Sequence, residues 1–205
     1  MTLYYTPAYR ETKRSDGSKQ IDDLVDIRRY DTTIRVDMLF ASENNFTGEQ
    51  LYGAPACLMQ RPLAIKLHQA QMIFLKDGYC LKINDAYRPQ SVQYKLYDAI
   101  GSTRYIANPD NASKHNRGCA VDVTLTDAEG NDIEMPSAMH TFDESAHRVN
   151  RDMSETARAN LQYMTDVLLE CGLESYKYEW WHYILPDFEQ YLVTDYDLAA
   201  IPLAP

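Results

Sequence analysis

The chain has 205 residues, 45% of them apolar, and a formal net charge of −10 at pH 7. This length and composition fit one globular domain and exclude a disordered chain. The acidic charge disfavours nucleic acid and anionic membranes as partners, since both favour basic surfaces. The sequence has no apolar run of about 18 residues that would predict a membrane span. The N-terminal stretch lacks the apolar segment of a signal peptide, so we expect a cytoplasmic protein unless an exported form has lost its signal.

The first half of the chain predicts a polar arm followed by strands and helices. Residues 1–20 favour an extended arm, and residues 25–40 suggest one or two strands. Residues 62–77 predict a helix, because a proline opens the segment and apolar residues recur at helical spacing. Residues 79–85 predict a strand, and a further helix is expected to about residue 100. Arg88 therefore lies where a strand gives way to a helix, a common position for functional residues.

The second half predicts two more strands around one long helix. Residues 119–125 alternate like a strand, and residues 133–152 are irregular. Residues 155–171 predict the clearest helix, and the aromatic residues 175–184 predict a strand. A short terminal helix follows. Together the elements predict a single-domain α+β fold over residues 1–205, with a mainly antiparallel central sheet flanked by helices.

The four cysteines are widely spaced and include no C-x-x-C pair: Cys57, Cys80, Cys119 and Cys171. This spacing favours reduced thiols in the core. Cys119 precedes Asp122 by three positions, so strand alternation turns the two side chains to opposite faces. A cysteine-ligated metal is therefore the weaker interpretation.

The stretch SKHNRGCAVDVTL, residues 113–125, places an acid in the middle of a predicted strand. Asp122 either faces solvent, as many strand acids do, or lines a cleft on the small polar face of this strand. His115 lies seven positions earlier, which is about 23 Å along a straight strand. The segment Asn116–Gly118 suits a reversal of the chain. A site shared by His115 and Asp122 is therefore permitted by the spacing.

The stretch YKYEWWHYIL, residues 176–185, adds a second histidine and a second acid. In a regular strand Glu179 and His182 face opposite sides, and a bulge or one helical turn would bring them to the same side. The alternative is an aromatic core strand with an incidental histidine. With His115 and Asp122, His182 completes two imidazoles and one carboxylate, the ligand set of a catalytic zinc with one open position. Glu179 supplies a nearby carboxylate, and a zinc hydrolase needs a general base beside the bound water.

These two stretches resemble the D-alanyl-D-alanine dipeptidases of the VanX type, a group of zinc peptidases that act on cell-wall peptides. The upstream segments NNFTG (44–48) and DAYRP (85–89) agree in order. The resemblance implies one zinc per chain, in a cleft on the sheet, with D-Ala-D-Ala as the substrate. It also implies a role for each matching position: His115, Asp122 and His182 as zinc ligands, Glu179 as the base, Arg88 as the group that stabilises the oxyanion, and Ser113 in the substrate pocket.

Two positions depart from the pattern of the resembled family. Phe40 stands where relatives have a tyrosine, and His140 stands where they have an aspartate; both of those residues are associated with the ammonium group of the dipeptide. We therefore expect Phe40 and His140 to contact the substrate and to select free dipeptides less strongly, unless Asp143 or Glu144 takes over the role. Of the other histidines, His147 is expected near the site or on the surface.

Three functions remain open on the sequence. The first is zinc-dependent hydrolysis of a small peptide of D-amino acids. The second is a D,D-carboxypeptidase or endopeptidase that acts on longer peptidoglycan stems, which Phe40 and His140 favour because an acylated amine needs no carboxylate partner. The third is a non-catalytic, zinc-stabilised domain that binds cell-wall peptides. Glu179 and the open fourth ligand position disfavour the third function, since structural zinc sites have four protein ligands and need no base.

Overall fold

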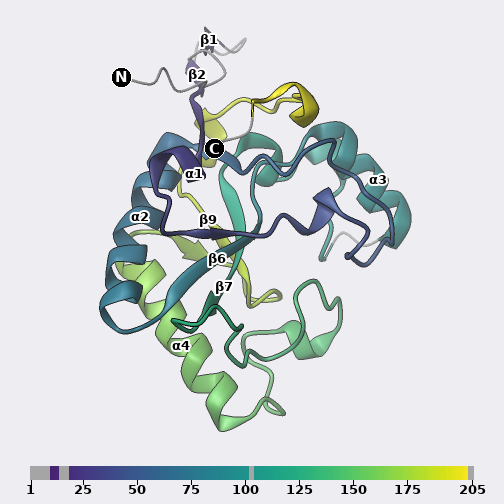
Figure 1. The fold of residues 1–205 in the computed structure, drawn as a ribbon. Coiled ribbons are helices and arrows are strands. Elements are labelled where there is room, and N and C mark those ends of the chain that lie inside the picture. Colours follow the sequence, from purple (N-terminus) through teal and green to yellow (C-terminus); the bar gives the residue numbers. More distant parts are fainter. Residues whose placement is uncertain (1–9, 14–18, 102–103, 203–205) are drawn as a thin grey trace.

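The computed structural model describes residues 10–13, 19–101 and 104–202 and arranges them around a five-stranded sheet (Figure 1). The strand order is β4-β6-β7-β9-β8, with β4 parallel to β6 and every other pair antiparallel. The strands are β4 (Arg35–Val36), β6 (Cys80–Asp85), β7 (Ala120–Thr126), β8 (Glu174–Ser175) and β9 (His182–Ile184). The predicted α+β fold with a mainly antiparallel central sheet is confirmed.

Two smaller strand pairs lie outside this sheet. β3 (Leu24–Asp26) pairs with β5 (Leu58–Gln60), and β1 (Arg10–Lys13) pairs with β2 (Lys19–Asp22), both antiparallel. The β1–β2 pair projects from the body of the molecule (Figure 1). Most of the expected arm, residues 1–9 and 14–18, lies outside the described residues.

Two long helices lie together on one side of the sheet, and a third lies on the opposite side of the molecule (Figure 1). The helices are α1 (Ile27–Tyr30), α2 (Arg61–Lys76), α3 (Gln90–Ile100) and α4 (Glu155–Glu170). α2 contacts both α4 and β6. The Ser154 hydroxyl accepts a hydrogen bond from the Ala157 backbone N–H and so caps α4, as its sequence predicts. The predicted bounds of α2 and α4 are correct to within one residue.

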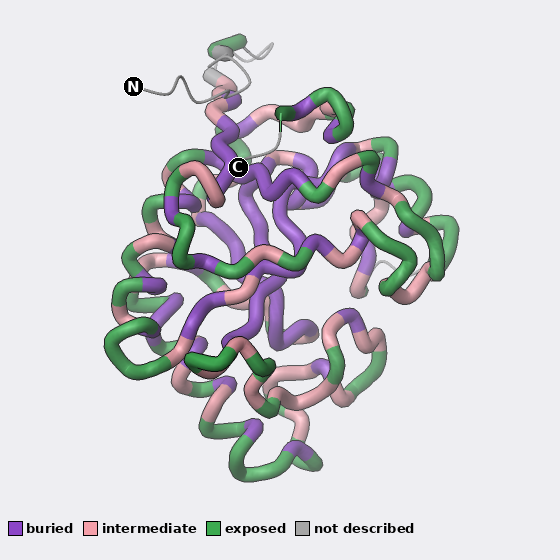
Figure 2. Tube along the Cα trace, viewed as in Figure 1, coloured by how far each residue is buried: buried purple, intermediate pink, exposed green. Residues whose placement is uncertain are grey.

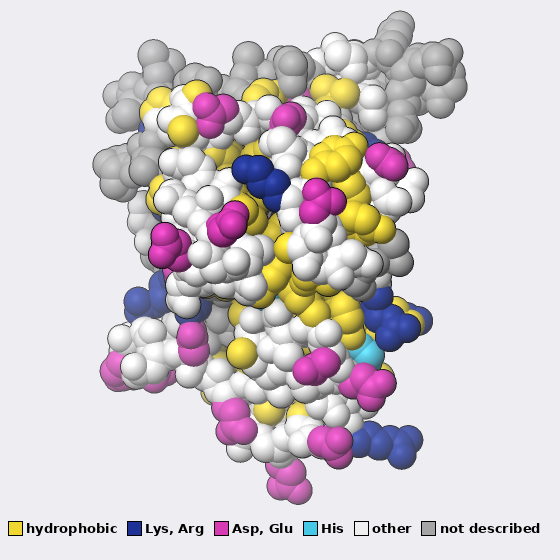
Figure 3. Space-filling view, turned by 90° about the vertical axis from the view of Figure 1, so that its right-hand side faces the viewer, with side chains coloured by type: hydrophobic (Ala, Val, Ile, Leu, Met, Phe, Trp, Pro, Cys, Tyr) yellow, Lys and Arg dark blue, Asp and Glu magenta, His cyan; other side chains and the backbone are white. Residues whose placement is uncertain are grey.

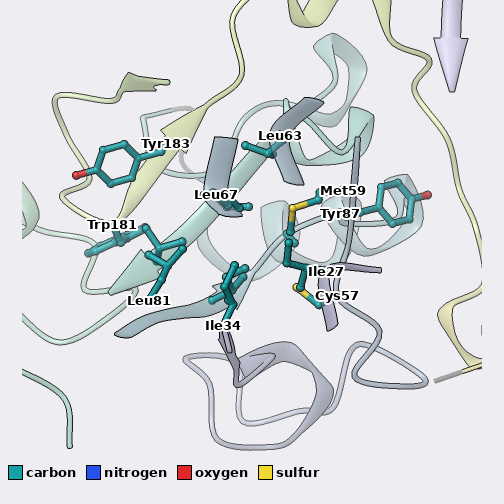
Figure 4. Close-up of a cluster of buried hydrophobic side chains, with 14 of the residues drawn as sticks. Ile27, Ile34, Cys57, Met59, Leu63, Leu67, Leu81, Tyr87, Trp181 and Tyr183 are labelled. Atoms are coloured by element: carbon teal, nitrogen blue, oxygen red, sulfur yellow. The ribbon is translucent and has the colours of Figure 1, made fainter. Parts of the chain in front are cut away.

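The core forms where the apolar stripe of α2 meets the sheet. Leu63, Leu67, Ala70 and Phe74 are all fully buried. In Figure 4, Leu63 and Leu67 belong to the same buried cluster as Leu81 of β6. Burial of one leucine side chain contributes about 1.5–3 kcal/mol. This packing fixes β6, and through it the strand beside it, β7.

Every residue of β7 is buried, so neither face of this strand meets bulk water. Figure 2 shows the central strands as the buried centre of the molecule. The solvent-facing alternative for Asp122 is therefore excluded, since its exposed fraction is 2%. A carboxylate at such a position needs partners of opposite charge or hydrogen-bond donors.

The predicted strand over residues 175–184 is wrong. β8 and β9 are two short strands of a hairpin, separated by a turn at residues 176–181. Trp180 and Trp181 are adjacent, and both are almost completely buried. A regular strand would turn one of the two rings away from the core, whereas the turn buries both. Aromatic content, which favours strands in general, here reflects core packing.

Two weaker predictions are refined. The strands expected over residues 25–40 are β3 and β4, and the short helix α1 lies between them. The expected terminal helix is replaced by two single 3-10 turns, Phe188–Gln190 and Leu198–Ala200.

All four cysteines are free, and three of them are buried. Burial raises the pKa of the Cys57 and Cys119 thiols, which disfavours the thiolate form that binds metals.

Within the described part of the chain, no helix combines the length and the apolar content that crossing a bilayer requires. Figure 3 shows the face on the α3 side, where a band of hydrophobic side chains is surrounded by scattered acidic and basic ones.

Candidate active site

Three predicted ligand residues meet in the centre of the molecule. The distance from His115 Nε2 to His182 Nδ1 is 3.2 Å, and the distance from His182 Nδ1 to Asp122 Oδ1 is 2.9 Å. His115 Nε2 lies 3.5 Å from Asp122 Oδ1. All three residues are buried. Residues up to 67 positions apart in the sequence thus bring one ligand atom each to a single point.

The reversal expected between His115 and Asp122 is a 3-10 turn, His115–Arg117, that ends at Gly118. Gly118 has a φ of +65°, and a Cβ atom there would lie 2.3 Å from Leu24 Cδ2. Only glycine satisfies both the positive φ and the close approach. After this turn β7 begins, and its pairing with β9 sets Asp122 directly opposite His182.

The spacing of the three possible ligand atoms suits a metal ion bound between them. Ligand atoms on a tetrahedral zinc, with bonds of about 2.0–2.1 Å, lie about 3.3 Å apart. The observed separations of 2.9–3.5 Å match this value. His115 Nδ1 contacts the Ala86 carbonyl oxygen at 2.7 Å, so Nδ1 carries the proton and the Nε2 lone pair faces the centre. The chemistry of this donor set therefore suits a divalent cation.

The charges at this point also suit a cation. Burial lowers the pKa of His182 to about 4, so its imidazole is neutral and has a lone pair to offer. Burial alone would raise the pKa of Asp122, but the three imidazoles around it, above all that of His115, hold this pKa well below its usual range. The set thus provides two imidazole nitrogens and one carboxylate.

Glu179 reaches the same pocket from the turn at residues 176–181. Its Oε2 lies 3.8 Å from His182 Nδ1, and the side chain is almost fully buried. The sequence predicts that a bulge or one helical turn could bring Glu179 and His182 to the same side of the chain, and this turn does so. Burial, and then the negative charge of Asp122, raise the pKa of Glu179 well above its usual range. A carboxylate in these surroundings is a stronger base than one in water.

Arg148 holds this turn in place with all five of its N–H donors. Nε donates to the carbonyl of Tyr176 at 3.0 Å, and Nη2 donates to the carbonyls of Trp180 and His182 at 2.7 and 3.4 Å. Nη1 donates to the hydroxyls of Thr165 and Tyr183. One side chain from a distant loop therefore adds five hydrogen bonds to the backbone bonds that close the turn carrying Glu179.

Arg88 lies between β6 and α3, at the predicted junction, and is held on two sides. Nε and Nη2 donate to Asp85 Oδ2 at 3.1 and 2.6 Å, and Nη1 donates to Gln93 Oε1 at 2.8 Å. Tyr52 donates its hydroxyl to the other oxygen of Asp85. Nη2 is 4.0 Å from Asp122 Oδ2. The guanidinium is thus fixed beside the ligand cluster.

The residues predicted to contact substrate all line the pocket that contains the ligand atoms: Ser113, Phe40 and His140. The Ser113 hydroxyl accepts a hydrogen bond from the His115 backbone N–H. The rings of Phe40 and His140 are stacked, with centroids 5.1 Å apart. His140 Nε2 lies 3.1 Å from Asp122 Oδ2.

The rest of the pocket wall is aromatic and basic. Its aromatic side chains include Tyr105, Phe142, Tyr176 and Trp181, and its basic ones include Arg104 and Lys114. Among the described residues that line the pocket, the only acids are Asp122 and Glu179.

Asp143 and Glu144, the two possible replacements for the missing aspartate, do not line the pocket. Asp143 instead accepts hydrogen bonds from the backbone N–H and hydroxyl of Ser145.

Several residues around the site were missed from the sequence. Asp85 and Gln93 bracket Arg88 in the sequence, and their spacing could have suggested the contact. Tyr52 and Arg148 had no local signal. His147 is partly buried and contacts the Tyr105 hydroxyl at 3.0 Å, at the edge of the pocket.

Comparisons with known proteins show the family of the chain. The peptidase M15 family model, described as D-ala-D-ala dipeptidase, matches residues 20–197. The chain belongs to this family. The D-alanyl-D-alanine dipeptidase of Escherichia coli is 29% identical over 169 residues, which cover 82% of this chain and 88% of the relative. The D-alanyl-D-alanine dipeptidase of Enterococcus faecalis is 28% identical over 187 residues, which cover 81% and 92%.

One solved structure is also similar, that of a mutant vancomycin-resistance D,D-pentapeptidase, VanY, in complex with Zn(II). It covers 65% of this chain and 76% of its own, with a TM-score of 0.42 and 16% identity. Membership of the M15 family confirms the predicted resemblance and makes the chain a member of a metallopeptidase family.

Proposed function

We propose that the chain is a zinc-dependent peptidase that hydrolyses a small peptide of D-amino acids, most directly the dipeptide D-Ala-D-Ala. The observation that carries this proposal is the convergence of His115, Asp122 and His182 on one point beside the buried carboxylate of Glu179. The names of the relatives support the substrate class.

One zinc per chain would be held by the two histidines and Asp122. When bound, it would polarise the scissile carbonyl and make a water molecule more acidic. Ser113, through its contact with the His115 backbone, keeps the first ligand in place at the pocket wall.

Glu179 carries the proton through the reaction. Its carboxylate takes a proton from the attacking water as the oxygen bonds to the carbonyl carbon. The same proton then passes to the amide nitrogen as the C–N bond breaks, so that the products are a free acid and a free amine. The buried surroundings that raise the pKa of Glu179 favour its protonated form between these two transfers.

Arg88 stabilises the negative charge that develops on the carbonyl oxygen. Its guanidinium keeps its charge at any physiological pH, and Asp85 and Gln93 hold it in one orientation. A donor fixed in advance needs no reorganisation when the charge appears.

A second candidate is a D,D-carboxypeptidase or endopeptidase that acts on longer stem peptides. It is favoured by the pocket wall, where the only acids among the described lining residues are Asp122 and Glu179. A free ammonium would meet Phe40, His140 and other rings in place of a carboxylate, whereas an acylated nitrogen would not need one. A non-catalytic binding domain is less well supported, because Glu179 has no role in it.

The test is a substrate panel offered to the zinc-loaded protein: D-Ala-D-Ala, its N-acetylated form, a stem pentapeptide and L-Ala-L-Ala. The proposal expects release of D-alanine from at least one D,D-peptide and none from L-Ala-L-Ala. Faster cleavage of the acetylated or longer peptides would favour the second candidate. If the zinc-loaded protein releases no D-alanine from any of the peptides, the proposed function is wrong.

A further inference from the structure

We infer that His140 is a positioning residue for Asp122: it binds one carboxylate oxygen and leaves the other to face the two ligand histidines. This inference deepens the proposed function and rests on its metal site. It assigns to the imidazole a task toward the metal centre, in addition to its place in the pocket wall.

The two oxygens of Asp122 have different neighbours. Oδ1 lies 2.9 Å from His182 Nδ1 and 3.5 Å from His115 Nε2, at the point where the ligand atoms meet. Oδ2 lies 3.1 Å from His140 Nε2 and 4.0 Å from Arg88 Nη2. Because a carboxylate only accepts, the proton of this hydrogen bond belongs to His140 Nε2. The bond opposes rotation of the carboxylate and so selects Oδ1 as the ligand atom.

The ring of His140 is itself held in place. Phe40 stacks against it at an interplanar angle of 8°, and the edge of the ring meets Trp181 at 5.7 Å between centroids. The residue is 7% exposed and has a φ of 57°, a strained value for a residue other than glycine. Such a backbone conformation persists where the surroundings demand it.

The other ring nitrogen does not decide the orientation of the ring. His140 Nδ1 is buried and has no hydrogen-bond partner among the described residues. The one hydrogen bond that orients the imidazole is the bond to Asp122. A side chain whose purpose was only to fill the pocket wall would need no such bond.

The experiment compares two amides at position 140. In His140→Gln the amide nitrogen reaches about as far as Nε2, so it can still donate to Asp122. In His140→Asn the amide has the same chemistry but is one methylene shorter, and asparagine tolerates a positive φ well. Zinc affinity is measured for both variants by competition with a chelator, and the melting temperature is measured for the zinc-free proteins.

We expect His140→Asn to bind zinc about 10–100-fold more weakly than the wild type, and His140→Gln to stay within a few-fold of it. The melting temperatures show whether a variant has lost its fold and not only its zinc. Equal zinc affinity of His140→Asn and wild type, or an equal loss in both amides, would overturn the inference. The control is Asp122→Ala: if this variant binds zinc as the wild type does, the metal site of the proposed function is wrong, which is a different outcome.

Discussion

Two buried polar clusters in this molecule differ in how their hydrogen bonds are completed. Around Gln71, each hydrogen-bond donor faces an acceptor. The side-chain amide N–H donates to the Thr33 carbonyl at 2.9 Å, and the side-chain carbonyl accepts from the Leu81 N–H at 2.8 Å. At the proposed metal site, one possible ligand atom each from His115, Asp122 and His182 faces the other two.

The difference separates a structural role from a functional one. A polar cluster whose donors and acceptors pair with one another stabilises the fold and needs no ion or ligand from solution. A buried cluster of converging acceptors is incomplete without a cation.

Asp122→Ala removes the carboxylate from the converging set. We expect zinc to fall from one per chain to nearly none, and peptidase activity to fall to the detection limit, because two neutral imidazoles hold zinc weakly. Metal analysis after dialysis measures the first effect and D-alanine release the second. The control is Asp132→Ala, at an exposed aspartate outside the pocket, which should keep both. Full zinc occupancy in Asp122→Ala would contradict the ligand assignment.

Glu179→Gln keeps the shape of the side chain and removes its ability to take a proton. We expect zinc content to be unchanged and kcat to fall by about 10²–10⁴, the usual contribution of a general base. Glu174→Gln, at an exposed position on β8, is the matched control and should keep the wild-type rate. Wild-type turnover in Glu179→Gln would mean that another group moves the proton.

Arg88→Lys keeps the positive charge but loses the two-point contact with Asp85. If Arg88 stabilises the oxyanion, kcat should fall by about 10²–10³ while zinc binding persists. Arg61→Lys is a fair comparison, because Arg61 also makes a two-point contact with an aspartate, Asp23, but on the surface. We expect no kinetic effect there, and equal effects at both positions would argue against a specific role for Arg88.

Gln71→Leu tests the cluster around Gln71, in which donors and acceptors pair with one another. The substitution leaves the Leu81 N–H without its partner and removes one of the hydrogen bonds to the Thr33 carbonyl, which keeps the one from the Cys80 thiol. We therefore expect the free energy of unfolding to fall by about 1–3 kcal/mol. The kcat of the folded enzyme should not change. Denaturant unfolding gives the first value, with the exposed Gln162→Leu as control. A large loss of kcat at unchanged stability would show that the two clusters are not distinct.

Sequence periodicity predicted the parts of the fold that depend on neighbours along the chain. The stripe of α2 and the alternation of β7 are visible in the sequence because burial repeats with the geometry of the element. Residues 175–184 were misassigned because their turn is held by Arg148, which contacts them from 28 positions away through backbone carbonyls. No local pattern records such a contact.

In the candidate site, too, the features that depend on nearby residues could be predicted and the long-range contacts could not. Asp122 and His115 share one stretch, and their joint use could be argued from its turn residues. The contact of His140 with Asp122 depends on how residues 133–152 are placed beside β7, and the only regular element of this segment is one 3-10 turn, Glu144–Ala146. Similarly, Tyr52 approaches Asp85 from a loop 33 positions away.

Arg148 also has a consequence for the dynamics of the molecule. Since its five donors hold Tyr176, Trp180, His182 and two hydroxyls at once, the turn cannot loosen at one residue without weakening the bonds at the others. Local opening should therefore be cooperative, and the backbone amides of residues 179–182 should exchange their hydrogens with one shared free energy. Glu179 and His182, the proposed base and one proposed metal ligand, would then leave the pocket together.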